Sequence, residues 1–548
     1  MLISRLLLKD RSWLLLLAVA LVALLTSTVQ WMQDHPNAIC WDEAEYFNAV
    51  LSDQGAVRDY GLRGLYRQIR YDDRGRPPGY RILAIPFYSI FGFRPTVLRL
   101  ASMGFTWLGL LLLYLTAHKI ADRKCAVLSV LVCCLSPAQV LWSGLFYTEN
   151  PLFLASAGTF YFLVSSVTSG SATARNWIGL GLSIGLGLLS KASFVPVAAS
   201  VLGFALVAGR IPGLVGPSPS FAIKAGALGS LAAAPWWWMN GAWAVRFGRE
   251  ARNDALGSLG APSIGTWMSW PATVAQGILG HGMTIVVVLI ALIWIRKRFI
   301  RRDARLDSVQ RTVLLACGCA ILPLVLLQLT GTNHQLRYLC PAVVPLAIAV
   351  GLLAHVSGWS NSPALLGISA LSLLAQLSML VMPVYYPNTR VSIGLVNGVL
   401  PWEAHARLDQ WDWKPLRQLS RSCGFDEPRI SVLGDGLHLG EPQIRYAWAV
   451  DGKLKTRVER LVPWGDRNGP IDWDRVMAAV RESDIVVTAP GYTGKNSGQD
   501  LAAENRHNSE LVHRLEGSPG FSGPIRFWMG RFEPAEVDVF VRKRQPSP

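Results

Sequence analysis

Three carboxylates stand within four positions in the stretch Trp41-Asp42-Glu43-Ala44-Glu45-Tyr46. Acids in a loop are usually solvated, but this loop follows the first long apolar run of the chain. It therefore belongs at the surface of a membrane, where a substrate carried by a lipid could meet the carboxylates. An ionised carboxylate in such a place can accept a proton from a reacting hydroxyl group.

The composition around this loop is that of a membrane protein. Of the 548 residues, 51% are hydrophobic and only 16% are charged, whereas a soluble domain carries about 25% charged residues. The mean hydropathy is +0.31. Several apolar runs approach the roughly 20 residues that cross a bilayer, and such runs must be helical because lipid offers no partner to an unpaired amide. We therefore predict a polytopic α-helical membrane protein.

The net charge of +16 has an explanation that needs no polyanionic partner. Lysine and arginine mark the cytoplasmic loops of membrane proteins, and no basic stripe with interleaved aromatic residues indicates nucleic-acid binding. The eight cysteines show no metal-ligand spacing. Only Cys40 and Cys423 stand clearly outside the apolar runs, where one disulfide is conceivable.

The apolar runs predict about eleven spans by the length rule. Arg5, Lys9 and Arg11 precede the first run, which indicates a retained signal anchor and a cytoplasmic N-terminus. The strongest basic segment, 296–311, is also expected inside. The predicted spans are 13–31, 96–115, 125–144, 152–168, 177–189, 194–207, 222–235, 273–295, 313–330, 339–356 and 363–384.

Residues 32–95 are predicted to form a long external loop. Loops of this length can escape the positive-inside rule, which matters because this one is rich in arginine. The apolar piece 82–91 is too short to span and is expected to lie as a helix at the interface. The arginines of the loop are Arg58, Arg63, Arg67, Arg70, Arg74, Arg76, Arg81 and Arg94.

The pattern changes after the last span. Residues 1–390 form the membrane module, and residues 402–548 read as a small soluble α/β domain, placed outside by the odd number of spans. Strands are expected at 429–434, 484–488 and 537–541, and helices at 472–482 and 501–515. Gly434-Asp435-Gly436 is a turn rather than a phosphate loop, because no helix with Lys-Ser/Thr follows it.

Six loop motifs resemble those of the GT-C superfamily of membrane glycosyltransferases. The resemblance covers about residues 10–390 and is greatest to the branch of the lipid A aminoarabinose transferase and the protein O-mannosyltransferases. Arg76 replaces the family's usual lysine, and Gly75 stands where some members carry an acid. In chain order the motifs are Asp42-Glu43, Arg76-Pro77-Pro78, Thr148-Glu149-Asn150-Pro151, Leu188-Leu189-Ser190-Lys191, Pro235-Trp236-Trp237 and Arg337-Tyr338-Leu339-Cys340-Pro341.

The resemblance implies one-step inverting transfer of a sugar from a polyprenyl-phosphate donor to a lipid, glycan or protein acceptor. The expected setting is the external face of the inner (plasma) membrane, in modification of lipopolysaccharide or another cell-envelope glycan. Asp42 or Glu43 would take the proton of the acceptor hydroxyl. Arg76, Lys191 and Arg337 would neutralise the departing phosphate, with arginine favoured for its bidentate fork.

Four further residues are predicted to line the sugar or acceptor site: Tyr46, Glu149, Trp236 and His334. Glu149, Trp236 and His334 also have simpler interpretations. Glu149 at the mouth of a span can belong to a structural ion pair, and Trp236 can anchor the chain at the interface. His334 could bind a divalent metal together with Glu149 or be an ordinary interfacial histidine. A metal is therefore possible, and no other cofactor is indicated.

Two other classes of function stay open at this point. A transporter or flippase of the same lipid-linked sugar would show broken spans, internal repeats and charges at mid-membrane, whereas here the charges cluster at one face. A non-catalytic membrane scaffold would use its external domain to bind a partner. Turnover of a sugar donor separates the enzyme from both.

Overall fold

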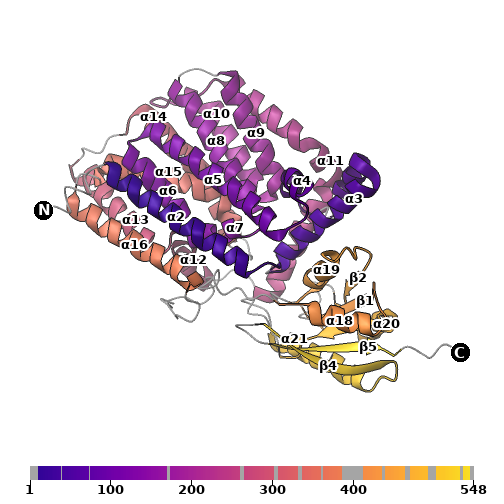
Figure 1. Ribbon diagram of the computed structural model, residues 1–548. Helices are drawn as coiled ribbons and strands as arrows, with labels where there is room; N and C mark the ends of the chain where they lie inside the picture. Colours follow the sequence, from indigo (N-terminus) through magenta and orange to yellow (C-terminus); the bar gives the residue numbers. More distant parts are fainter. Residues whose placement is uncertain are drawn as a thin grey trace.

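The computed structural model shows a bundle of long helices with a small sheet-containing domain at one end (Figure 1). It describes residues 10–543 except 39, 73–74, 170–172, 260–263, 302–305, 331–335, 360–361, 386–410, 435–438, 463–469, 492–500 and 531–534. The predicted class, a polytopic helical membrane protein with a C-terminal α/β domain, is confirmed. The predicted boundary between 390 and 402 lies outside the described residues.

Seven helices of the described chain are long and apolar enough to cross a membrane. Two more predicted spans are helix pairs bent at a short break: α6 (Arg123–Cys134) with α7 (Pro137–Gly144) at 65°, and Trp270–Leu279 with His281–Phe299 at 109°. The seven candidate spans are α2 (Asp10–Asp34), α5 (Pro95–Ile120), α8 (Glu149–Ser169), α10 (Val195–Val207) with its flanking turns, α14 (Ser308–Thr330), α15 (Cys340–Ser357) with the preceding η5 (Leu336–Leu339), and α16 (Pro363–Tyr385).

The other two predicted spans also form helices, but they are less apolar or shorter. α9 (Ala174–Ser190) has 17 residues, and α11 (Pro219–Leu259) has 41. Both are rich in glycine, alanine and serine, which let helices approach closely but lower the hydropathy. The segment from 236 to about 270 was predicted to follow the span 222–235 as an external loop. Its first part is helical, because α11 continues to Leu259.

The segment between the first two spans folds into two helices. α3 (Trp41–Tyr71) carries Asp42 and Glu43 in its first turn and is broken at Gly61. Acids in a first turn stabilise a helix through its dipole. α4 (Gly79–Phe91) is the short apolar piece that was expected at the interface.

Gly79 brings the start of α4 against the end of α9. A Cβ at this position would stand 2.6 Å from the backbone oxygen of Leu189, so a larger residue would push the two elements apart. Arg76 lies three residues before Gly79, and Lys191 lies two residues after Leu189. The close approach therefore brings two of the predicted cations to one end of the bundle.

The C-terminal domain contains a five-stranded sheet in the order β2-β1-β3-β5-β4. β1 is parallel to β2 and β3, and β5 is antiparallel to β3 and β4. β2 and β4 were not predicted, because the short edge strand β2 is polar and β4 contains Pro524. The elements are α18 (Lys414–Ser422), β1 (Arg429–Leu433), α19 (Glu441–Ala449), β2 (Arg457–Arg460), α20 (Trp473–Glu482), β3 (Ile485–Thr488), α21 (Leu501–Glu516), β4 (Phe521–Met529) and β5 (Ala535–Arg542).

This domain docks on the helix that carries the acidic stretch. Asn48 of α3 donates from Nδ2 to the backbone oxygen of Pro442 over 2.9 Å. One turn along α19, the ring of Tyr446 lies 5.6 Å from that of Phe47, and both side chains are buried. The C-terminal domain therefore covers the first half of α3, and Figure 1 shows α19 on the side that faces the bundle.

We expect Tyr446→Ala to loosen this contact. Truncating a buried large aromatic side chain costs about 3 kcal/mol or more, so the purified protein should unfold at a lower temperature and α3 should exchange amide hydrogens faster. Trp528→Ala is the control, because Trp528 belongs to the same domain but is 72% exposed. Unchanged exchange in α3 would show that the docking contact does not hold this helix.

Candidate functional site

Asp42 lies between two arginines that come from distant parts of the chain. Arg337 of η5 forms an ion pair with its Oδ2. Arg76, in the turn before α4, lies with Nη2 3.9 Å from Oδ1 and also pairs with Glu45. All four side chains are only partly buried. The predicted acid and two predicted phosphate-binding cations thus meet at one place, where each keeps part of its surface exposed to solvent.

A second ion pair lies beside the first. Lys191, just after α9, pairs with Glu149, which opens α8 and is almost fully buried. Thr148 donates from Oγ1 to the other carboxylate oxygen of Glu149 over 3.0 Å. The ring of Tyr338 joins the two pairs, because Lys191 Nζ lies 5.0 Å and the Arg337 guanidinium 5.7 Å from its centroid.

These residues form a charged cluster in which acids and bases balance. We use this name for Asp42, Glu45, Glu149, Arg76, Lys191 and Arg337. Each cation has a carboxylate partner in this structure. An anion that binds here must therefore take a carboxylate's place on one or more cations, and charge-assisted bonds of the same kind would hold it.

The surrounding charges tune Asp42. Burial by itself raises the pKa of this carboxyl group, but the positive charges of Arg337 and Arg76, with a smaller effect of Lys191, outweigh it and keep the pKa below its ordinary value. Asp42 is therefore ionised at neutral pH. It is also a weak proton acceptor while both arginines face it, because a low pKa means a small driving force for proton transfer.

Glu43 has a different environment, although it is the next residue. It is fully buried and forms a two-pronged pair with Arg99 of α5, at 2.8 Å from Nε and 2.6 Å from Nη2. The amide of Phe146 donates to its Oε1 over 3.0 Å. Arg99 also donates to the backbone oxygens of His35 and Asn37. Both oxygens of Glu43 are thus engaged inside the protein, which favours Asp42 as the proton acceptor.

Two buried arginines that support the site, Arg99 and Arg81, were not predicted from the sequence. Arg99 stands inside the predicted span 96–115, and a charge within an apolar run was the available signal. Arg81 pairs with Asp53 in the interior, with Nε 2.9 Å from Oδ2, and so joins α4 to α3. Nothing in the neighbourhood of Asp53 distinguishes it in sequence, because it occupies an ordinary buried helical position.

Aromatic side chains line one side of the charged cluster. The Arg76 guanidinium lies 5.8 Å from the ring of Tyr46. That ring packs between Tyr80, at 4.6 Å, and Tyr147, at 5.8 Å. Cys40 is a free thiol and lies 2.7 Å from the hydroxyl of Tyr147, so its partner is not Cys423.

Trp236, predicted to line the sugar or acceptor site, is not joined to the cluster by these contacts. Trp236 is buried in α11 and its ring meets Trp237 edge-on at 5.2 Å. It is Trp237 that donates to the Leu188 backbone oxygen, near Lys191, over 3.1 Å. His334 lies outside the described residues, so a metal beside Glu149 and His334 stays a prediction. Among the described residues, the one group with metal-ligand chemistry lies elsewhere, at Asp122, Cys125 and His355.

Comparisons with known proteins give one family match and several matches in fold. Residues 75–238 match the model of the dolichyl-phosphate-mannose-protein mannosyltransferase family. That segment contains Arg76, Glu149 and Lys191, but neither Asp42 nor Arg337. No curated protein matches the chain in sequence.

Solved structures extend the likeness to the whole chain. The protein is similar to ArnT from Cupriavidus metallidurans in the apo state, with a TM-score of 0.55, 11% identity, and coverage of 96% of this chain and 97% of that one. The same protein bound to undecaprenyl phosphate gives a TM-score of 0.54 at 10% identity and equal coverage. An oligosaccharyltransferase from Archaeoglobus fulgidus is less similar, with a TM-score of 0.47, 12% identity, and coverage of 94% and 73%.

The helical bundle and the docked α/β domain together define a polytopic helical membrane protein with a small C-terminal α/β domain. Within that class, the whole chain has the fold of ArnT. The resemblance predicted from the six motifs is thereby confirmed.

We expect Glu43→Gln to destabilise the protein strongly. The change keeps the shape but leaves Arg99 buried without its counter-charge, which costs about 3–5 kcal/mol. Glu250→Gln is the matched control, because Glu250 forms an exposed pair with Arg246 and such pairs contribute about 0–1 kcal/mol. Thermal unfolding in detergent measures both. Equal unfolding temperatures in the two variants would show that the Glu43–Arg99 pair does not stabilise the fold.

Proposed function

We propose that the protein is a glycosyltransferase that moves a sugar from a polyprenyl-phosphate donor to a lipid, glycan or protein acceptor. The observation that carries the proposal is the position of Asp42, an accessible carboxylate between Arg76 and Arg337 with Lys191 beside them. A phosphate that leaves an anomeric carbon needs cations to stabilise its negative charge. A hydroxyl group that attacks the same carbon needs a proton acceptor. The GT-C fold and the likeness to a structure bound to undecaprenyl phosphate support the same class of donor.

The charge balance of the cluster suggests how the two tasks are linked. A donor phosphate that binds Arg337 and Arg76 takes the place of Asp42 on these cations. Once the arginines face the phosphate, their charge is partly neutralised, so the pKa of Asp42 rises and the carboxylate becomes a better base. Asp42 is thus held in a weakly basic state until the donor is present.

The proposed reaction is a single displacement at the anomeric carbon. The acceptor oxygen forms a bond to that carbon while the bond from the carbon to the phosphate oxygen breaks. The acceptor proton passes to Asp42. The polyprenyl phosphate leaves, and the positive charges of the arginines and Lys191 stabilise its negative charge. Inversion at the anomeric carbon follows from one-step attack, as the family resemblance implies.

We further propose that the site faces the external side of the inner membrane. The basic segment that contains η4 (Arg296–Arg301) belongs in the cytoplasm by the positive-inside rule. The N-terminus would then be cytoplasmic and the C-terminal domain periplasmic. The contact of Asn48 with Pro442 supports placing that domain at the same end of the bundle as Asp42. A transporter of the same lipid would also have broken spans, and two helix pairs here are bent at a short break. The charged cluster lies at one end of the bundle and not at mid-membrane, however, and this favours the enzyme.

Loss of either arginine should weaken binding of undecaprenyl phosphate, the probe we choose. A hydrogen bond to a charged group contributes about 1.5–3 kcal/mol, so Arg76→Gln and Arg337→Gln should each lower the affinity roughly tenfold or more. Arg526→Gln is the control, because Arg526 lies in the C-terminal domain and is 58% exposed. Titration in detergent, followed by native mass spectrometry, measures the affinity. Wild-type affinity in both site variants would remove these arginines from the phosphate site.

Asp42→Asn should abolish most sugar transfer without weakening the binding of the donor. The amide keeps the shape but cannot accept the proton, and general-base catalysis contributes about 10²–10⁴-fold. Binding of undecaprenyl phosphate should stay as tight or become tighter, because a competitor for Arg337 is gone.

The measurement is single-turnover transfer from the polyprenyl-phosphate sugar that co-purifies with the protein, identified by mass spectrometry. Glu45→Gln serves as the comparison, because Glu45 lies beside Asp42 at the start of α3 and also pairs with Arg76. Wild-type transfer by Asp42→Asn would refute the assignment of the base. Co-purification of a sugar-free lipid and no transfer by the wild type would refute the proposed function.

A further inference from the structure

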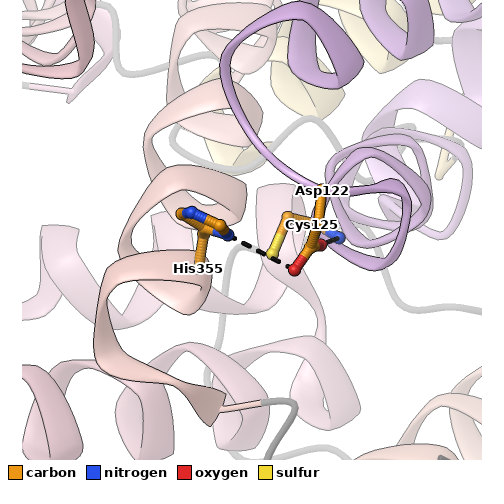
Figure 2. Close-up of side chains that lie close together, drawn as sticks. All are labelled: Asp122, Cys125 and His355. Carbon is orange, nitrogen blue, oxygen red and sulfur yellow. Dashed lines mark hydrogen bonds and ion pairs between the residues drawn. The ribbon is translucent and has the colours of Figure 1, made fainter. Parts of the chain in front are cut away.

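A second group of reactive side chains lies at the other end of α15 from Arg337. Asp122 precedes α6, Cys125 lies in the first turn of α6, and His355 lies in the last turn of α15. One ligand atom from each residue lies within 4.8 Å of the others, and Figure 2 shows the three side chains pointing toward one another. At 1.5 Å per residue, α15 separates this group from the charged cluster by about 25 Å.

We propose that Asp122, Cys125 and His355 form a binding site for a zinc ion. One oxygen, one sulfur and one nitrogen are ligand types that Zn²⁺ combines in proteins, and a thiolate disfavours Mg²⁺ and Ca²⁺. Asp122 Oδ2 lies 3.3 Å from His355 Nδ1. Two ligands with zinc bonds of about 2.0–2.1 Å at the tetrahedral angle are separated by about 3.3–3.4 Å, so this spacing fits a shared ion.

The local structure aims the three groups at one point. Asp122 caps α6, and its Oδ1 accepts from the amide of Cys125 over 2.8 Å. The second oxygen therefore faces His355. Cys125 is three residues further on, which places it on the same side of the first turn. A carboxylate oxygen and a sulfur from one short segment are thus presented together.

Close packing of α15 against α6 supplies the third group. A Cβ at Gly351 would stand 2.8 Å from the backbone oxygen of Cys125, so glycine is needed for the two helices to approach this closely. His355 follows Gly351 by four residues and therefore lies on the same face of α15. The helix contact that Gly351 permits brings His355 over Asp122.

Access and charge also suit a metal ion. Cys125 is fully buried, whereas the side chains of Asp122 and His355 are 42% and 36% exposed. An ion could enter from the exposed side and keep a water as its fourth ligand. A carboxylate and a thiolate neutralise the two positive charges of Zn²⁺. The bound ion would tie the start of α6 to the end of α15, the helix whose other end follows Arg337.

The simpler interpretation is an aspartate cap that pairs with a histidine, and it does not require a cysteine at position 125. Cobalt distinguishes the two, because Co²⁺ bound to a thiolate gives a charge-transfer band in the near ultraviolet. The full-length protein, purified without a metal-affinity column, is titrated with CoCl₂ and then with ZnCl₂. We expect one Co²⁺ per chain, a thiolate band, and its loss when Zn²⁺ displaces the cobalt.

Two variants test the ligands, and a third is their control. Cys125→Ser should remove the thiolate band, and Cys319→Ser, which changes a cysteine of α14 outside the group, should leave it unchanged. Asp122→Asn keeps the helix cap, since asparagine caps as well as aspartate. Asp122→Asn should nevertheless lower zinc affinity by roughly tenfold or more, by analogy with losses in the outer ligand shell.

Stability provides a second readout that does not depend on cobalt. Zinc should raise the unfolding temperature of the wild type and of Cys319→Ser, and this rise should shrink in Asp122→Asn. The proposal is overturned if the wild type shows no thiolate band, if the band persists in Cys125→Ser, or if zinc leaves the wild-type unfolding temperature unchanged. Because the first and last of these use the wild type, they decide the question even if Cys125→Ser does not fold.

Discussion

The buried ion pair between Glu43 and Arg99 is the interaction on which the site depends. Arg99 belongs to α5, Glu43 to the first turn of α3, and their other partners are the backbones of 35–37 and of Phe146. Four segments of the chain thus meet at two side chains without exposure to water. Because breaking such a pair leaves a charge buried alone, the start of α3 has one position relative to α5. That position sets where Asp42 and, through the 145–149 segment, Glu149 lie.

Two neighbouring acids have opposite tasks because of helix geometry. Successive residues of an α-helix point about 100° apart, so Glu43 faces the interior while Asp42 faces the accessible side. There Asp42 meets Arg337 and Arg76, and Glu45 meets Arg76 again. A single helical turn therefore provides both the anchor and the proposed base. An anchor one residue from the base leaves little freedom for the carboxylate to drift.

The C-terminal domain packs against the same helix, α3. Phe47 packs between Phe146, next to the Glu43 anchor, and Tyr446 of the domain. The domain thus contributes to the core that surrounds the first half of α3. An acceptor or partner that bound the domain would act on a helix only a few residues from Asp42, which offers a physical route for coupling the two.

The sequence by itself determined the class of the protein and most of the residues that meet in the charged cluster. Apolar runs long enough to cross a bilayer specify helices through local energetics alone, and all eleven predicted runs are helical in the structure. The motif order identified Asp42, Arg76, Lys191 and Arg337, which the fold brings to one place. Tertiary structure decided the rest, because partner choice depends on contacts between residues far apart in the chain. Only packing pairs Glu43 with Arg99 and brings His355 to Asp122 across 233 positions.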